Sequence, residues 1–203
     1  MSTISIEEKL LIVEGKDDIN FFNALSKYLG INNYQIKPTN GISNYNSKIS
    51  AIWKEYVLKS IVNSIGIVRD ANNNFDGTFQ SVQTALKNSD LPVPRKPLLP
   101  AINQDTGLRV NVFIMPDNGS RGILEDLLLL SVNENPAMPC VNEYFNCLTE
   151  IGIDPKNMSK ARTQTYLAAQ IECSMSIGVA AQKDYWPFSH ESFLDICDFL
   201  KSL

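Results

Sequence analysis

Three short, largely apolar runs, each followed by a segment of helical length, constrain the fold of this 203-residue chain more than any other feature. The runs lie at residues 10–13, 65–68 and 109–115. Strands that are hydrophobic along their whole length are typical of parallel sheets buried on both faces. Alternation of such strands with helices predicts an α/β fold, with a mainly parallel central sheet flanked by helices on both faces.

Residue spacing predicts the other elements. Apolar residues recur at helical spacing over 17–29, 42–62, 75–86 and 122–132, and residues 34–37 alternate like a short strand. Residues 91–104 hold four of the ten prolines and predict an irregular connection. Three further helices are expected over 141–151, 160–171 and 189–203. We therefore expect one domain over 1–203, with a core at about 1–132 and a helical C-terminal extension at about 133–203.

Composition narrows the class of protein. The net charge of −4 and the pI of about 5.1 argue against a broad basic surface that binds nucleic acid. They do not argue against a small, local binding surface. The first residues lack the basic and apolar regions of a signal peptide, and no run is long enough for a membrane-spanning helix. The four cysteines have no C-x-x-C spacing, so we expect buried free thiols in a cytoplasmic protein rather than a zinc site.

Acidic residues stand where each of the three long strands ends. Glu14 follows the first strand, Asp70 follows the second, and Asp117 follows the third. In parallel α/β sheets, ligands bind outside the carboxyl ends of the strands. The sequence therefore predicts that these acids gather at one edge of the sheet.

The residues around Glu14 and Asp70 favour a metal site. Gly15 allows a tight turn after the strand, so that the Glu14 carboxylate projects from the sheet edge. Asp18, in the first turn of the next helix, can point to the same place, and two such acids repel unless a cation or proton intervenes. If the chain is extended at Asp70 and Asn72, both face the same way and offer oxygen ligands suited to Mg²⁺.

Glu125 and Asp126 open the helix after the third strand, where the helix dipole favours acids. Only one of them can easily face the sheet edge, and we favour Glu125. Each acid named so far also has a structural interpretation. Glu14 can be a capping or salt-bridged residue, Asp70 and Asn72 can form a turn, and Glu125 can be a dipole partner.

Three segments together resemble a known pattern. They are Val-Glu-Gly-Lys-Asp-Asp at 13–18, Asp-Ala-Asn at 70–72, and Pro-Asp-Asn at 116–118 followed by Gly-Ile-Leu-Glu-Asp-Leu-Leu at 122–128. They resemble the Toprim domain of topoisomerases, primases and OLD-type nucleases, and most closely the small Toprim-like family DUF3226. The resemblance covers most of the chain, and its last segment is the most specific. It implies a Toprim fold, which is Rossmann-like.

The resemblance also implies a Mg²⁺ or Mn²⁺ site that cleaves phosphodiesters. Glu14 matches the Toprim glutamate, a metal ligand or general acid–base, and Asp70 matches the first metal-binding aspartate. Asn72 stands where a second aspartate is usual, which removes one negative charge. Asp18 and Glu125 match acids that OLD-type nucleases use for a second ion.

Basic residues complete this expected site. Lys160 resembles the late catalytic lysine of OLD-type nucleases, although a solvated surface lysine is the alternative. Charge developing on phosphate would be neutralised by cations near the acids. The candidates for phosphate contact are Lys16, Arg69 and Arg121, together with Lys160.

Two other functions stay open beside the nuclease. One is a binding module for nucleic acid or nucleotide with weak or absent catalysis, favoured by Asn72 and the acidic composition. The other is a homodimer or a partner subunit in a nucleic-acid complex, without membrane attachment. A serine-protease-like triad is disfavoured because the lone His190 sits near an expected helix start. No tyrosine can be placed as a topoisomerase nucleophile.

Overall fold

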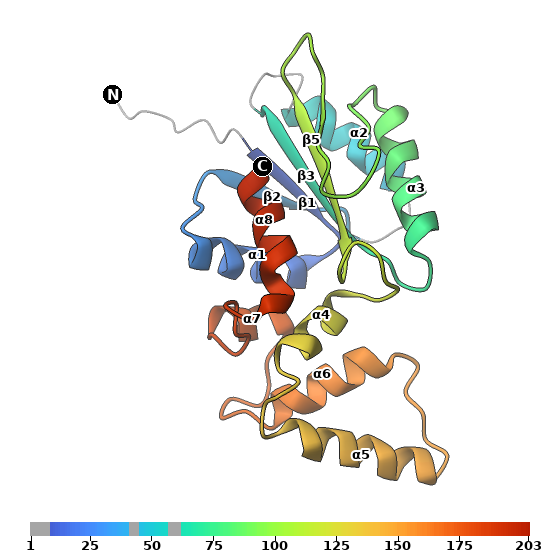
Figure 1. The fold of residues 1–203 in the computed structure, drawn as a ribbon, viewed down its shortest axis with the longest axis vertical. Helices are drawn as coiled ribbons and strands as arrows, with labels where there is room; N and C mark the ends of the chain where they lie inside the picture. Colours follow the sequence, from blue (N-terminus) through green and yellow to red (C-terminus); the bar gives the residue numbers. More distant parts are fainter. Residues whose placement is uncertain (1–8, 41–44, 57–61) are drawn as a thin grey trace.

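A computed structural model describes residues 9–40, 45–56 and 62–203 and is centred on a five-stranded sheet (Figure 1). The strand order is β2-β1-β3-β5-β4; the first four are parallel, and β4 pairs antiparallel with β5. The strands are β1 (Lys9–Val13), β2 (Tyr34–Pro38), β3 (Ser64–Asp70), β4 (Ala101–Ile102) and β5 (Arg109–Met115). The predicted α/β fold with a mainly parallel sheet is confirmed.

Helices cover both faces of the sheet because successive strand residues point to opposite sides. On one face, Leu11, Val68 and Phe113 share a core with residues of α1 (Lys16–Leu29), α4 (Leu124–Ser131), α7 (Ile177–Gln182) and α8 (Leu194–Ser202). On the other face, Ile12 and Ile67 pack with residues of α2 (Tyr45–Tyr56) and α3 (Phe75–Lys87). The strands are therefore buried on both sides, as their apolar runs predicted.

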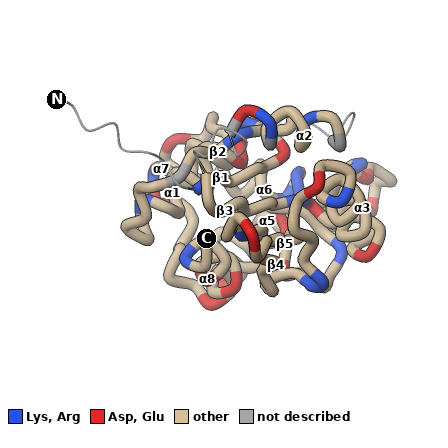
Figure 2. Tube along the Cα trace, turned by 90° about the horizontal axis from the view of Figure 1, so that it is seen from above, with Lys and Arg blue, Asp and Glu red and all other residues tan. Residues whose placement is uncertain are grey.

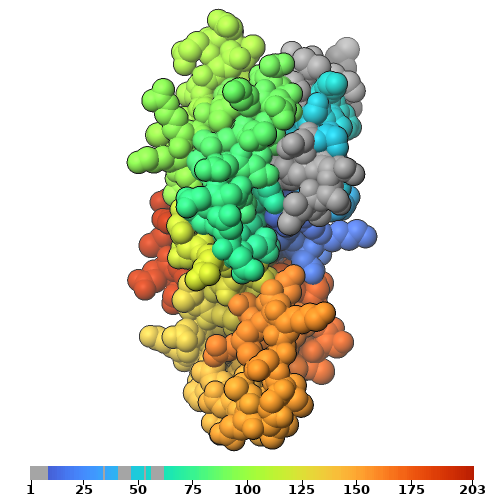
Figure 3. All heavy atoms as spheres, turned by 90° about the vertical axis from the view of Figure 1, so that its right-hand side faces the viewer, coloured from blue at the N-terminus to red at the C-terminus, as the bar shows by residue number. Residues whose placement is uncertain are grey.

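The segment expected to form a helical C-terminal extension divides into two parts. α5 (Met138–Glu150) and α6 (Met158–Ala168) form one end of an elongated molecule, beyond the carboxyl ends of the strands (Figures 1 and 3). The chain then returns, so that α7 packs on α1 and α8 packs on the sheet. A short 3-10 turn, η1 (Glu191–Phe193), leads into α8.

Hydrogen bonds join the C-terminal residues to the middle of the sheet. The Arg109 guanidinium donates to the Ser202 carbonyl at 2.7 Å, and the Asn111 amide donates to the Ser202 hydroxyl at 3.0 Å. Gly66 leaves space for the last side chain, because a Cβ there would lie 2.6 Å from Leu203 Cδ1. The end of the chain is thus part of the core.

Several boundaries differ from those expected. The helix predicted over 42–62 is described only as α2, and residues 42–44 and 57–61 lie outside the described residues. β4 lies within the segment expected to be irregular, and α7 was not predicted; elements of two and six residues are too short for a periodic signal.

The cysteines are free, but Cys140, Cys147 and Cys173 are exposed, so the expectation of burial holds only for Cys197. In the described ranges, no helix has the length and apolar character needed to cross a membrane.

Candidate acidic site

A cavity of about 580 Å³ lies at the carboxyl ends of β1 and β3, beside the first turns of α1 and α4. Acids from three separate parts of the chain line it, together with lysines from α1 and α6. They are Glu14, Asp17, Asp18, Asp70 and Glu125, with Lys16 and Lys160. The cavity therefore gathers most of the residues that the sequence predicted for a metal and phosphate site.

The turn between β1 and α1 places Asp18. Gly15 has extended backbone before the helix, and its N–H donates to Asp18 Oδ2 at 2.7 Å. This bond satisfies one of the free amides at the start of the helix and fixes the orientation of the Asp18 carboxylate. Burial raises the pKa of Asp18 to about 6; the Gly15 N–H partly offsets this effect, and the nearby Glu14 carboxylate adds to it.

Asp70 connects the end of β3 to the start of α4. Its Oδ1 accepts the Leu124 N–H at 3.1 Å, while its own N–H points at Glu14 Oε1 at 3.4 Å. Burial, followed by the charges of Glu14 and Asp18, raises the pKa of Asp70 to about 8. The ionised form of Asp70 is thus disfavoured by burial and by neighbouring carboxylates, and a bound cation would offset the second effect.

Glu14 is paired with a buried cation. Arg69 Nε lies 3.3 Å from Glu14 Oε1, and the Arg69 side chain is only 4% exposed. The guanidinium also reaches the Ser81 hydroxyl at 3.4 Å on α3. Arg69 is not among the residues that line the cavity, so the structure places this predicted phosphate contact behind Glu14 instead.

The two acids in the first turn of α4 have different positions and contacts. Glu125 lines the cavity, whereas Asp126 turns back and accepts the Ile123 N–H at 2.8 Å, capping the helix. Asp126 also accepts a hydrogen bond from Ser159 on α6. Lys160 follows, with its Nζ 3.8 Å from Glu125 Oε1, and burial raises the pKa of Glu125 despite this lysine. The end of the molecule formed by α5 and α6 therefore contributes a cation to the site.

Besides Arg69, three other predicted residues lie outside the lining of this cavity. Asn72 is exposed, and its backbone forms an isolated antiparallel β-bridge with Gly122. Its φ of 51° is left-handed, so the extended geometry that the prediction assumed is absent. Arg121 is exposed in the loop before α4. Asp117 accepts the N–H groups of Gly119 and Ser120, at 3.0 and 2.7 Å, within its own turn.

Two lining residues with polar side chains were not among the predicted ligands. Asp17 directly precedes Asp18, and the two acids in sequence were a usable signal for both. Asn40 follows β2 and has a left-handed backbone with φ of 53°. An Asn-Gly sequence is typical of such a turn. The sequence therefore predicts the turn, but it does not predict that Asn40 lies near Glu14.

The acids suit a divalent ion in chemistry but are not gathered around one position. Carboxylate oxygens are the ligands that Mg²⁺ and Mn²⁺ prefer. Burial, and after it the neighbouring carboxylates, raise the pKa values of Asp18 and Asp70, so their ionised forms are disfavoured when no cation is near. Over the described parts of the chain, however, no three Asp, Glu, His or Cys side chains form a group that could hold a metal ion. Binding would therefore require side-chain movement within the cavity.

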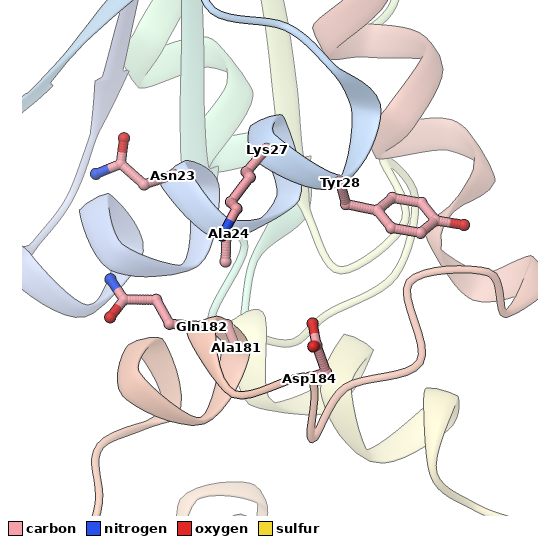
Figure 4. A pocket seen from close by; sticks show the side chains of 7 residues that line it. All are labelled: Asn23, Ala24, Lys27, Tyr28, Ala181, Gln182 and Asp184. Atoms are coloured by element: carbon pink, nitrogen blue, oxygen red, sulfur yellow. The ribbon is translucent and has the colours of Figure 1, made fainter.

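Another cavity, of about 500 Å³, lies between α1 and α7. Its side chains include Asn23, Lys27, Tyr28, Gln182 and Asp184. In Figure 4 they point in different directions and do not converge on one place. Basic and acidic positions are also interspersed along the chain in Figure 2. The acidic cavity is consequently the better candidate for chemistry.

The fold and this cavity define an α/β protein with a carboxylate-lined site at the carboxyl ends of a parallel sheet. The chain belongs to DUF3226, described as a protein of unknown function, whose family model matches residues 8–203. No curated protein matches the sequence.

Two solved structures share a distant likeness with the chain, and both are of the C-terminal region of the OLD protein of Xanthomonas campestris pv. campestris. The one phased with platinum has 12% sequence identity and a TM-score of 0.49, covering 96% of this chain and 92% of that one. The one phased with iodine has 12% identity and a TM-score of 0.44, covering 98% and 99%. With both TM-scores below 0.5, neither residue roles nor activity are transferred from them.

Proposed function

We propose that this chain is a Toprim-like, nuclease-like protein that cleaves phosphodiesters with a divalent metal at the acidic cavity. One observation carries the proposal. Glu14, Asp18, Asp70 and Glu125, four acids from three separate segments, line a single cavity with two lysines. The resemblance of the same segments to the Toprim pattern supports it, as does the raised pKa of Asp70.

The four acids are the proposed ligands for Mg²⁺ or Mn²⁺. When bound, such an ion lowers the pKa of a bound water and offsets negative charge on a transferring phosphoryl group. The Leu124 N–H holds Asp70 in position, and the Gly15 N–H holds Asp18. Asn72 has no part in this set, because its side chain is exposed outside the cavity.

Glu14 and the two lysines are the candidates for direct roles with the substrate. Arg69 holds the Glu14 carboxylate, which would act as ligand or general base. Lys160 is 60% exposed beside Glu125, so it can reach a phosphate entering from solvent. Lys16 lines the same cavity from the start of α1 and would share this role.

A second function, nucleic-acid or nucleotide binding without efficient cleavage, is favoured by three observations. The acids are not grouped around one ion position in the described residues, and Glu14 already has a partner in Arg69. The left-handed backbone of Asn72 keeps its side chain out of the cavity in addition. These features would weaken metal affinity while leaving the lysines available to a phosphate.

The deciding experiment is a Mn²⁺ titration of the full chain by isothermal calorimetry and electron paramagnetic resonance. We expect binding in the micromolar to low millimolar range, and loss of at least tenfold in affinity for Glu14→Gln. Asp117→Asn is the matched control, since this acid also follows a strand but lies outside the cavity. Wild-type protein that binds no Mn²⁺, or a Glu14→Gln variant that binds as tightly, would refute the metal site.

Cleavage is then measured on single- and double-stranded DNA and RNA with Mn²⁺ or Mg²⁺. The proposal expects nicking or degradation that Glu14→Gln and Lys160→Ala reduce and Asp117→Asn does not. Intact substrates together with a measured metal affinity would favour the binding module instead. All three variants require a circular dichroism melt, so that loss of fold is not taken for loss of activity.

A further inference from the structure

A groove of about 590 Å³ lies on the opposite side of α4 from the acidic cavity, between α4, the loop after it and the start of α8. No residue lines both hollows. Leu127 is 2% exposed in the groove, while Leu130 and Leu194 beside it are 53% and 60% exposed. Exposed apolar side chains that are grouped and have a polar rim mark interaction sites.

The rim of this groove is acidic. Asp117, Glu134, Glu191 and Asp195 line it, and none of its lining residues is a lysine or arginine. They come from the turn after β5, the loop after α4, and the η1–α8 segment, so the charges surround the leucines instead of forming one row. The acidic positions at α8 are visible in Figure 2.

We propose that the groove, defined by Leu130 and Leu194 and their four acids, binds a basic amphipathic segment of a partner protein. An apolar side chain of that segment would fill the hollow, and flanking lysines or arginines would meet the carboxylates. Helix-in-groove recognition has this form, with anchors spaced along one helix face. Opposite rim charges speed association and select against acidic partners.

The acids on the rim disfavour two other occupants. The phosphate backbone of a nucleic acid would be repelled by the four carboxylates. A second copy using the same face would place these carboxylates against their own equivalents, since a two-fold interface joins identical patches. A cationic partner satisfies the charge and the leucines together.

The test uses the full chain and a fluorescent helical peptide of about 15 residues, with leucines on one face and lysines on the other. We expect saturable binding, with anisotropy rising on titration and affinity falling with added salt. Leu194→Ser should weaken binding by at least tenfold, and Asp195→Lys by a similar factor. Ile153→Ser is the matched control, because Ile153 is 53% exposed elsewhere on the surface, and it should bind like wild type.

Two further peptides test whether binding depends on both the leucines and the lysines. One has serine in place of every leucine and the other has glutamate in place of every lysine, and both should bind at least tenfold more weakly. Equal binding of the serine peptide, or an unchanged affinity in Leu194→Ser and Leu130→Ser, would overturn the proposal. So would sedimentation showing a wild-type dimer that Leu194→Ser dissociates, because the groove would then be an interface between copies.

Discussion

The Nε atom of Arg69 lies 3.3 Å from Oε1 of Glu14, on the buried side of the acidic cavity. The arginine side chain is 4% exposed and the glutamate 21%, so the cation is almost out of water while the acid reaches the cavity. Burying an ion pair costs desolvation energy on both sides and seldom stabilises a fold by itself. The pair is better explained by its geometry, because Arg69 orients the Glu14 carboxylate at the edge of the cavity.

Arg69→Met should leave Glu14 without its cationic partner. We expect the free energy of unfolding to fall by roughly 3 kcal/mol, since removing one member of a buried pair leaves an uncompensated charge. Urea unfolding measures the change. Arg121→Met is the control, because this exposed arginine was an equal candidate by sequence and should change stability by less than about 0.5 kcal/mol. Similar losses for both variants would contradict the placement of Arg69.

Asp70 should make the protein less stable as the pH rises. Its pKa in the folded state, about 8, is above the ordinary value of 3.8, so the folded protein holds this proton more tightly than the unfolded chain. The resulting stabilisation is complete below about pH 4 and is lost as the pH rises through 8. Asp18 acts in the same direction, and its contribution to stability is lost as the pH rises from about 4 through 6.

Thermal melts in chelator at pH 5.5 and 8.5 test this linkage. Asp70→Asn should be more stable than wild type at pH 8.5 by an amount on the order of 1–2 kcal/mol, with a smaller difference at pH 5.5. Added Mn²⁺ should raise the melting temperature of wild type and not of the variant. If the difference in stability between wild type and Asp70→Asn is the same at both pH values, the pKa of Asp70 is not raised in the folded protein.

Asp18 and Asp126 occupy equivalent positions, since each accepts the N–H three residues before it at the start of a helix. Only Asp18 lines the cavity. Asn in place of either acid keeps an oxygen for the cap and removes the charge. Asp18→Asn should therefore lower Mn²⁺ affinity by about tenfold or more, and Asp126→Asn by less than about twofold. If calorimetry finds the same loss of Mn²⁺ affinity in both variants, the charge of Asp18 has no direct role in binding the ion.

Gly66→Ala tests whether the end of the chain belongs to the core. The new Cβ would lie 2.6 Å from Leu203 Cδ1 and 2.9 Å from Leu11 Cδ1, so we expect a loss of about 1–3 kcal/mol. Leu203→Ala removes the nearer neighbour and should relieve part of that loss. A double-mutant cycle from urea unfolding measures the coupling, and strictly additive effects would place Leu203 away from Gly66.

Local sequence determined the framework of this protein. Continuous apolar runs indicated β1, β3 and β5, and helical spacing indicated α1 and α3, because strand and helix periodicities depend on neighbouring residues. The acids Glu14 and Asp70 could be assigned to one sheet edge for the same reason. Parallel strands align their carboxyl ends, so a residue that ends a strand has a known place in the fold.

Tertiary structure decided which side chains meet. Arg69 turns to Glu14 across 55 residues of sequence, and Lys160 reaches Glu125 only because α6 packs on α4. Asn72, which was predicted to share the site with Asp70, instead has a left-handed backbone and lies outside the cavity lining. α7 and α8 return to cover α1 and the sheet. Such pairings depend on long-range packing and on single backbone angles, and neither leaves a periodic trace in the sequence.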